Sequence, residues 1–166
     1  MLKKITFTLL IITILLCLAC AQKNAENNLE NSKQIAKNVV HATSLGLGDL
    51  CVLEESKMEK IELIRKFIAP IRFYSDKTGY FYVYDINCNN IAHATQPDLV
   101  GQNLYNYQDS KGKYVIRKLS EKAQKGGGFV EFYWQKPNDE TEYKKMGYVE
   151  MIPGTDYFIG TGVYLE

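Results

Sequence analysis

The chain has 166 residues and a formal net charge of +1, with 20 lysines and arginines against 19 aspartates and glutamates. That length is enough for one domain with its own hydrophobic core. The near-neutral, mixed charge excludes the basic surface on which nucleic-acid binding depends, so no nucleic-acid partner is expected. Tyrosine is frequent, with 12 residues, which suits a ligand pocket and equally the surface of a sheet.

The first twenty residues have the pattern of an export signal. Two lysines precede an apolar run over residues 5–16. A membrane span needs roughly 20 apolar residues, so this run is too short to cross a bilayer but is typical of a signal peptide. A small residue stands directly before Cys20, as in the lipobox of bacterial lipoproteins, although Cys17 replaces the usual leucine. We predict that residues 1–19 are a signal peptide and that Cys20 is lipidated, with unlipidated cleavage or an uncleaved anchor as alternatives.

A tether and one domain are expected after this signal. Residues 20–31 are polar, rich in asparagine and without periodicity, which predicts a flexible tether. The domain would then comprise residues 32–166. The lipid would anchor this exported domain to the cell envelope, facing the periplasm or the cell exterior.

Two cysteines, Cys51 and Cys88, lie inside the expected domain. Export would place them in an oxidising compartment, where disulfides persist. Cys51 lies in a predicted helix and Cys88 follows the start of a predicted strand. If the strand runs back antiparallel along the helix, rises of about 1.5 Å per helical residue and about 3.3 Å per strand residue bring both sulfurs to the same level. We predict a disulfide between them, with two buried free thiols as the alternative.

Helical periodicity begins near residue 32. The apolar positions that share a face are Ile35, Val39, Ala42, Leu50, Leu53, Ile61, Ile64 and Ile68. This spacing indicates a helix that packs one side on the core. Gly46 and Gly48 weaken its middle, so the pattern fits one long helix with a soft point or two helices, and Pro70 ends or restarts it.

The second half of the chain changes to strand-like patterns. Strands are predicted at residues 80–84, 91–94, 129–134, 143–151 and 157–164, and a helix at residues 113–125 that stops at three glycines. The segment from Asp85 begins like a calcium loop, but Asn90 and Gln96 stand where glycine and glutamate are needed, so we interpret it as a hairpin turn. The predicted fold is α+β: a long N-terminal helix packed on a PAS-like antiparallel sheet of about five strands with a crossing helix. The other sheet face is left for a pocket.

Several short motifs, in order along residues 32–166, resemble the single Cache domains (type 2) of bacterial receptors. They are Arg72-Phe73-Tyr74, residues 79–85, Ile91-Ala92-His93, residues 97–104, residues 127–131, residues 145–149 and residues 159–164. The resemblance implies an extracytosolic sensor domain of the kind found in chemoreceptors and sensor kinases, with a role in chemotaxis or other signal transduction. The ligands it implies are small organic acids such as acetate, propionate, pyruvate or lactate.

The resemblance also implies a set of ligand-binding residues. They are Arg72, Tyr74, Tyr80, Tyr82 and Lys145, with His93 and Tyr148 as nearby candidates. Their chemistry suits a carboxylate, because arginine offers a fork of donors and lysine adds a second cation. Tyr80, Tyr82 and Tyr84 share one strand face by period two, so their hydroxyls can point together.

Each of these residues also has a structural interpretation. Arg72 could pair with Glu62 or Asp76 at the surface. Lys145 could be a solvated strand charge, and the tyrosines could simply pack. His93 is more readily a buried turn histidine that holds a backbone carbonyl than a ligand contact.

No catalytic or metal-binding set can be assembled from the sequence. A nucleophile with a base and an orienting group does not stand out, and His41 and His93 lack metal-ligand spacing, so we expect no enzyme, metal or cofactor. The expected function is that of a sensory or capture lipoprotein that binds a small organic carboxylate. The alternative is an envelope protein-interaction module that keeps the fold but has lost ligand binding. Because no kinase or methyl-accepting region precedes Glu166, a membrane receptor, sensor kinase or transporter is expected as partner.

Overall fold

The computed structural model describes the backbone of residues 2–165 and the side chains of residues 15–165. The chain divides into two compact units, Met1–Ser32 and Lys33–Glu166, and each is taken by itself. Most side chains of the predicted signal peptide, residues 1–14, lie outside the described part. Among the described residues, no helix has both the length and the apolar character that a membrane span requires.

The described residues of the first unit are helical throughout and belong to helix α1, Leu2–Val52. The predicted tether, residues 20–31, is therefore helical in this structure rather than irregular. A physical reason is that glycine and proline, the two strongest helix breakers, do not occur before Gly46. Once a helix has formed, extending it by one further residue costs little, so polar residues of fair helix propensity continue it.

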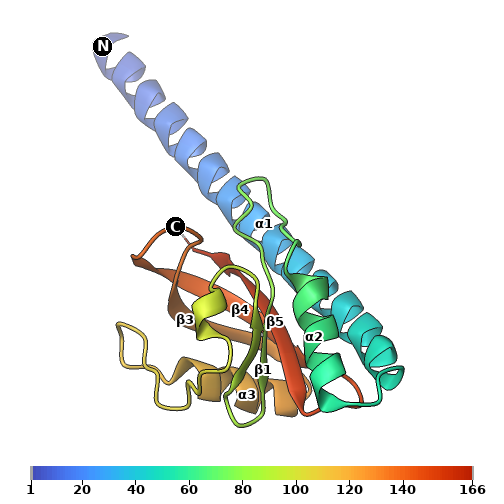
Figure 1. Ribbon diagram of the computed structural model, residues 1–166. Coiled ribbons are helices and arrows are strands. Elements are labelled where there is room, and N and C mark those ends of the chain that lie inside the picture. Colours follow the sequence, from blue (N-terminus) through green and yellow to red (C-terminus); the bar gives the residue numbers. More distant parts are fainter. Residues whose placement is uncertain (1, 166) are drawn as a thin grey trace. The chain divides into compact units, whose positions relative to one another are not determined.

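The second unit contains the remaining elements (Figure 1). They are helix α2 (Lys57–Ile68), strands β1 (Tyr82–Asp85) and β2 (Asn90–His93), a short 3₁₀ helix η1 (Pro97–Leu99), helix α3 (Val115–Gln124) and strands β3 (Gly128–Gln135), β4 (Glu142–Met151) and β5 (Tyr157–Tyr164). The five strands form one sheet in the order β2-β1-β5-β4-β3. All neighbouring strands are antiparallel. The predicted α+β, PAS-like fold is confirmed, and the strand limits differ from the predicted ones by only one or two residues.

The long helical stretch is broken at residues 53–56 and not at the glycines. Ser56 caps α2: its hydroxyl accepts from the Glu59 amide at 3.2 Å, and the Glu59 carboxylate accepts from the Ser56 amide at 3.0 Å. This reciprocal capping box satisfies two amides that would otherwise lack partners. Gly48 lies within α1, and the turn after β4 approaches it so closely that an added Cβ would lie 3.1 Å from Pro153. The sequence pattern allowed either one long helix with a soft point or two helices, and the second alternative is correct.

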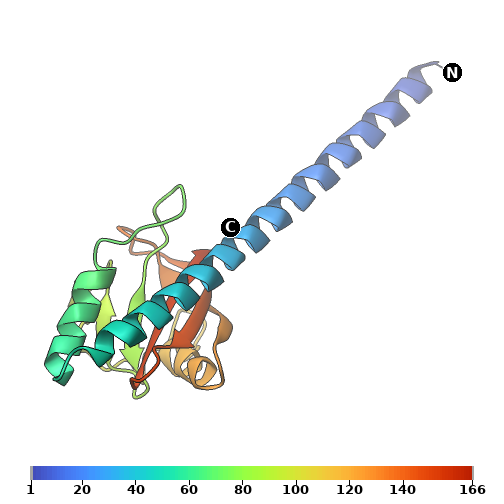
Figure 2. The ribbon, with the colours of Figure 1, turned by 90° about the vertical axis from the view of Figure 1, so that its right-hand side faces the viewer.

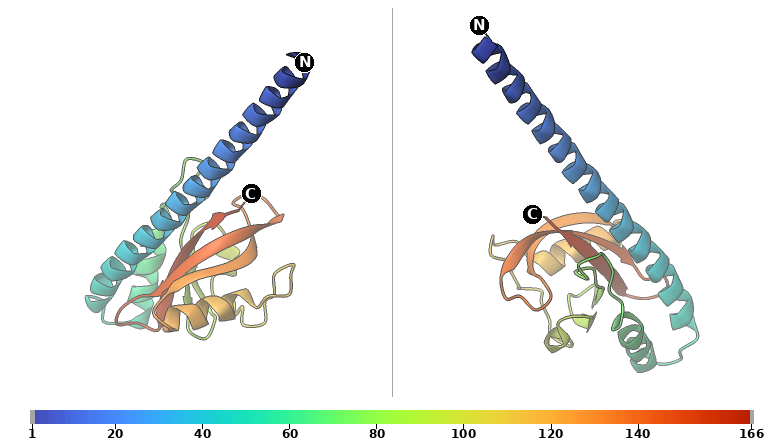
Figure 3. Two further views of the ribbon diagram at one scale, coloured as in Figure 1. Left: turned by 180° about the vertical axis from the view of Figure 1, so that it is seen from behind. Right: turned by 90° about the horizontal axis from the view of Figure 1, so that it is seen from above.

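The sheet separates two hydrophobic cores. The helix-side core includes Ala36, Val40, Leu47, Ile64, Ile68, Phe81, Val83 and Ile159. The cavity-side core includes Tyr80, Tyr82, Tyr84, Leu104, Val115, Ile116, Leu119, Phe132, Trp134 and Phe158. Figures 2 and 3 show residues 33–52 of α1 with α2 over one face and α3 over the other. Strands β1, β3, β4 and β5 contribute to both cores because successive side chains point to opposite faces.

The predicted disulfide is absent, which corrects the expectation. Cys51 and Cys88 are both buried free thiols. Cys51 belongs to the helix-side core and Cys88 to the cavity-side core. Equal levels along the strand direction do not bring the two sulfurs together, because the side chains lie on opposite faces of the sheet. The tight turn after Asp85, in which Cys88 has a φ of 69°, directs the Cys88 side chain to the face opposite α1.

Candidate functional site

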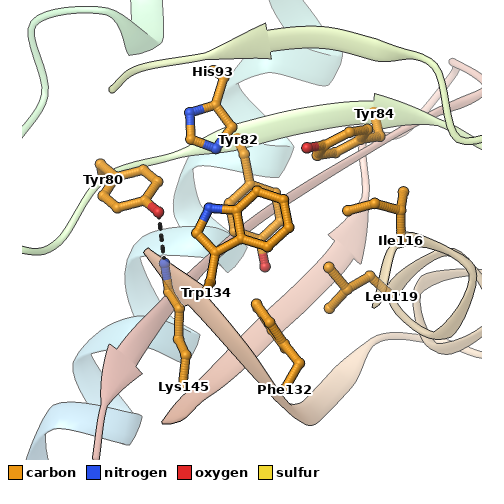
Figure 4. Close-up of a pocket in the computed structure, with 9 residues that line it drawn as sticks. All are labelled: Tyr80, Tyr82, Tyr84, His93, Ile116, Leu119, Phe132, Trp134 and Lys145. Carbon is orange, nitrogen blue, oxygen red and sulfur yellow. Dashed lines mark hydrogen bonds between the residues drawn. The ribbon is translucent and has the colours of Figure 1, made fainter. Parts of the chain in front are cut away.

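A small cavity lies in the cavity-side core between the sheet and α3. Its lining residues are Tyr80, Tyr82, Tyr84, His93, Ile116, Leu119, Phe132, Trp134 and Lys145 (Figure 4). Its volume is about 10 Å³, close to the smallest that admits one water molecule. The lining is mostly aromatic and aliphatic, includes one lysine and contains no carboxylate, a composition typical of a site for a small anion with an apolar part.

The first strand and the residues before it supply three tyrosines. Tyr80, Tyr82 and Tyr84 are each 4 % exposed or less, and all three belong to the cavity-side core. The prediction that they share one face is therefore confirmed. Tyr84, which the family resemblance left out of the ligand set, lines the cavity with the other two.

Lys145 of β4 brings a positive charge into this cavity. The residue is 1 % exposed. Its Nζ donates to the Tyr80 hydroxyl at 2.9 Å and to the Tyr164 hydroxyl at 3.3 Å. The same atom lies 4.1 Å from the centroid of the Tyr80 ring and 4.5 Å from that of Tyr164, within the range of cation–π attraction. Burial lowers the pKa of Lys145, and the Tyr80 hydroxyl acts in the opposite direction.

No carboxylate neutralises Lys145 within the described part of the chain. The ion pairs found there involve other residues, such as Lys144 with Glu131 and His41 with Glu150. A buried charge is normally paired, because transferring an ion out of water is expensive. The alternative interpretation of Lys145 as a solvated strand charge is therefore wrong, because the residue is buried and has no carboxylate beside it.

His93 is held as a neutral ring. Its Nδ1 accepts a hydrogen bond from the Gln96 amide at 3.0 Å, so the proton of the neutral imidazole lies on Nε2. Figure 4 shows this second ring nitrogen facing the cavity. Burial lowers the pKa of His93 to about 3, and the charges of Lys145 and Arg72 act in the same direction. The expected turn histidine is thus present, but it holds a backbone amide and not a carbonyl.

Arg72 does not line the cavity. Its exposed guanidinium donates to the carbonyls of Ala69 at 3.0 Å and Ile71 at 2.7 Å. A third bond of 2.6 Å reaches the carbonyl of Ala94, the residue directly after His93. Neither the expected carboxylate fork nor the alternative ion pair with Glu62 or Asp76 is formed. Arg72 instead fixes the end of β2 that carries His93.

Tyr74 and Tyr148 also lie away from the cavity lining. Tyr74 precedes the first strand and packs edge-to-face on Phe73, with 4.9 Å between ring centroids. Tyr148 belongs to the helix-side core and its hydroxyl donates to Glu150 at 2.7 Å. The sequence contained this signal: Tyr148 is three residues after Lys145 on one strand, and an odd spacing places two side chains on opposite faces.

Glycines beneath the cavity let its side chains lie flat on the sheet. A Cβ added to Gly160 would lie 2.5 Å from the Tyr82 ring, and one added to Gly162 would lie 2.8 Å from Cε of Lys145. Gly147 likewise has the Phe132 ring 2.6 Å from such a Cβ. Real Cβ atoms do not approach so closely, so these strand positions require glycine because of packing.

Sequence reasoning missed the walls of the cavity. Phe132 and Trp134 of β3 form one wall, and Ile116 and Leu119 of α3 form another. The Trp134 indole Nε1 donates to the Gln96 side chain at 2.8 Å. Phe132 and Trp134 are two residues apart, as on one strand face, and Ile116 and Leu119 are three apart, as on one helix face. The periodicity of a single sequence cannot distinguish residues that line a cavity from other residues of the hydrophobic core.

Comparisons with known proteins agree with this geometry. The family model described as Cache domain matches residues 11–166. A methyl-accepting chemotaxis protein from Vibrio parahaemolyticus is 30 % identical, with a TM-score of 0.75 over 87 % of this chain and 95 % of that structure. A structure described as "Structural basis for carboxylic acid recognition by a Cache chemosensory domain" is 24 % identical, with a TM-score of 0.74 over 85 % of this chain and 98 % of that structure, and shows the shared fold.

Two full-length relatives have known roles. The sensor histidine kinase MctS of Rhizobium johnstonii is 32 % identical over 143 residues, 85 % of this chain and 31 % of that protein. The methyl-accepting chemotaxis protein McpP of Pseudomonas putida is 26 % identical over 114 residues, 68 % of this chain and 20 % of that protein. The chain thus spans less than a third of the length of either relative. It belongs to the Cache domain family and is homologous to the extracytosolic ligand-binding domains of chemoreceptors and sensor histidine kinases.

Proposed function

We propose that this chain binds a small organic carboxylate in the cavity and acts as an extracytosolic sensory or capture protein. The observation that carries the proposal is the Lys145 ammonium group, which is 1 % exposed and bonded only to neutral tyrosine hydroxyls. A ligand carboxylate would supply the missing negative charge. Charge-assisted hydrogen bonds of this kind are about twice as strong as neutral ones.

The other lining residues support the same ligand class. The hydroxyl of Tyr80 accepts from Lys145 Nζ, so its own proton can be donated to a second carboxylate oxygen. The Nε2 proton of His93 adds a neutral donor. Phe132 and Trp134 would cover the short carbon chain of an acid such as acetate, propionate, pyruvate or lactate. In the related Cache chemosensory domain, the solved structure is described in terms of carboxylic acid recognition, which agrees with this assignment.

The size of the cavity limits the ligand and favours a second candidate function. A volume of about 10 Å³ holds about one water, so even acetate requires side chains that line the cavity to move apart. A cavity this small also fits an envelope protein-interaction module that has lost ligand binding. The two candidates differ in whether any small acid binds.

Titration of the full chain with acetate, propionate, pyruvate and lactate distinguishes them. We expect at least one acid to release or absorb heat on binding and to raise the melting temperature. Lys145→Met removes the charge at similar length and is expected to abolish binding. Lys144→Met is the matched control, because this neighbour points to the other face and pairs with Glu131 at 3.1 Å. No binding by any acid, or equal binding by Lys145→Met, would contradict the carboxylate proposal.

The anchor and the partner are part of the same proposal. Cys20 is an exposed free cysteine in this structure, and its lipidation would hold the domain at the membrane beside a receptor, sensor kinase or transporter. Cys20→Ser is expected to release the protein from membrane pellets and to stop incorporation of a fatty-acid label. Asn27→Ser, in the polar segment after the cysteine, is the control and should change neither.

A further inference from the structure

Two buried polar side chains on the cavity-facing side lack hydrogen-bond partners. Tyr84 is 0 % exposed and Asn90 is 1 % exposed. The Tyr84 hydroxyl and both amide atoms of Asn90, Oδ1 and Nδ2, have no partner in the described part of the chain. The two residues are direct neighbours across β1 and β2. Buried polar groups are hydrogen-bonded in the great majority of cases, so three such atoms at one place require an explanation.

The side chain of Asn90 is the polar neighbour of the Tyr84 hydroxyl and acts to lower the pKa of Tyr84, but the two do not meet in a well-formed hydrogen bond. Its ring stacks on Phe158 with 5.9 Å between centroids, and meets Tyr82 edge-on at 6.0 Å. These contacts explain the ring but leave the hydroxyl unused, since a phenylalanine would make them equally well. Burial raises the pKa of Tyr84, with the Asn90 side chain acting in the opposite direction. Tyr84 therefore stays protonated and can both donate and accept.

The hydroxyl belongs to the cavity that contains Lys145. Tyr84 lines it, and Figure 4 shows its hydroxyl directed towards the interior, at the other end from Lys145. The Tyr82 ring stands between the two ends, 5.9 Å from Lys145 Nζ and 6.0 Å from the Tyr84 ring, measured to ring centroids. The cavity therefore has a cationic end and a neutral polar end, with an aromatic surface between them.

We propose that Tyr84 and Asn90 form a second polar subsite, which binds a hydroxyl or keto oxygen of a ligand whose carboxylate lies on Lys145. This inference rests on the proposed function and narrows its ligand class. The ligand would be a hydroxy or oxo acid whose additional oxygen lies beyond the carbon next to the carboxylate. A hydroxyl matches a phenol and an amide because it donates and accepts at once. A second carboxylate fits poorly, because the Cys88 thiol nearby is also neutral: burial raises its pKa to about 11.

Matched acids of equal carbon number test the subsite. Calorimetric titrations of the full chain would compare propionate with 3-hydroxypropionate, and butyrate with 3-hydroxybutyrate and acetoacetate. We expect at least one oxygenated acid to bind roughly tenfold or more tightly than its parent, since leaving buried polar groups unpaired is costly. Tyr84→Phe should reduce that ratio to about one.

A control variant separates the subsite from general effects of removing a tyrosine hydroxyl. Tyr157→Phe removes one in the helix-side core and should keep the preference for the oxygenated acid. Thermal melting in the absence of acid checks folding, and Tyr84→Phe should melt no lower than the unaltered chain because its hydroxyl has no partner to lose.

The possible outcomes distinguish this inference from the proposed function. If parent and oxygenated acids bind equally, or Tyr84→Phe keeps the preference, the second subsite is overturned. The carboxylate site then still stands, provided that Lys145→Met abolishes binding of the parent acid. If none of these acids binds the unaltered chain, the second subsite is overturned, and the carboxylate site is overturned as well when acetate, pyruvate and lactate also fail to bind.

Discussion

The ammonium group of Lys145 donates a 2.9 Å hydrogen bond to the hydroxyl of Tyr80, 65 residues earlier in the chain. The two residues lie on either side of β5, because the sheet order places this strand between β1 and β4. The contact can cross β5 because Gly160 and Gly162 have no side chains in its path. The position of the Lys145 charge therefore depends both on the tyrosine hydroxyl that it contacts and on the two glycines of β5.

Lys145→Met is expected to stabilise the ligand-free protein. Replacing a buried, unpaired charge by an apolar chain of similar length removes a desolvation penalty. Urea unfolding measures the free energy of unfolding. Lys144→Met, which loses only an exposed ion pair, should change it by less than about 1 kcal/mol. A clear destabilisation by Lys145→Met would show that the charge is stabilising without ligand.

Carboxylate affinity is expected to fall as pH rises. The pKa of Lys145 is lowered by burial in the free protein, and a bound carboxylate would raise it again because it favours the charged form. Binding above the free-state pKa must therefore take up a proton, and the affinity should fall by up to about tenfold per pH unit. Titrations with propionate from pH 6 to pH 10 measure this slope. A flat profile would mean that Lys145 does not bind the carboxylate.

His93 is expected to make the fold sensitive to acid. The unfolded chain protonates a histidine near pH 6.5, whereas burial lowers the pKa of His93 to about 3 in the folded state. The contribution of His93 to the free energy of unfolding is therefore fully present above about pH 6.5. Between pH 6.5 and pH 3 the free energy of unfolding falls by up to about 1.4 kcal/mol per pH unit. His93→Asn can keep the bond from the Gln96 amide without titrating. Its unfolding free energy should depend less steeply on pH, and an unchanged slope would contradict the neutral, buried state of His93.

Gly160→Ala is expected to destabilise the fold and to disturb the cavity. The new Cβ would lie 2.5 Å from the Tyr82 ring, and such overpacking costs about 1–3 kcal/mol. Gly46→Ala is an informative contrast, since its Cβ would meet nothing within 4 Å and alanine in a helix is favoured by about 0.5–1 kcal/mol. Thermal unfolding should therefore move in opposite directions in the two variants. A tolerated Gly160→Ala would show that Tyr82 can move freely.

The fold was largely predictable because its elements carry local signals. Alternation of aromatic residues identified the strand of Tyr82, and the amphipathic pattern of Ile116 and Leu119 identified α3. What the local signals could not give was the pairing of distant segments. The free thiols of Cys51 and Cys88 illustrate this limit. The turn after Asp85 places the Cys88 side chain in the cavity-side core, so the sheet separates it from Cys51 in the helix-side core.

The candidate site was predictable only in part, for the same reason. Tyr80, Tyr82, His93 and Lys145 converge because neighbouring strands bring them together, whereas Arg72 contacts backbone carbonyls at the edge of β2. Trp134 lies in the site because its strand β3 pairs with β4, and no pattern in a single sequence reveals this pairing. The burial of Lys145 without a carboxylate neighbour, on which the proposed function depends, becomes visible only once all strands are in place.

A crystal structure of the full chain grown with propionate would show directly whether the carboxylate binds Lys145. We expect a carboxylate oxygen at about 2.8 Å from Lys145 Nζ, the usual length of a charge-assisted hydrogen bond. We also expect the Tyr164 hydroxyl to move away from Lys145 and the ligand's carbon chain to lie against Trp134. A structure in which propionate is bound elsewhere, while Lys145 keeps its bonds to Tyr80 and Tyr164, would contradict this expectation.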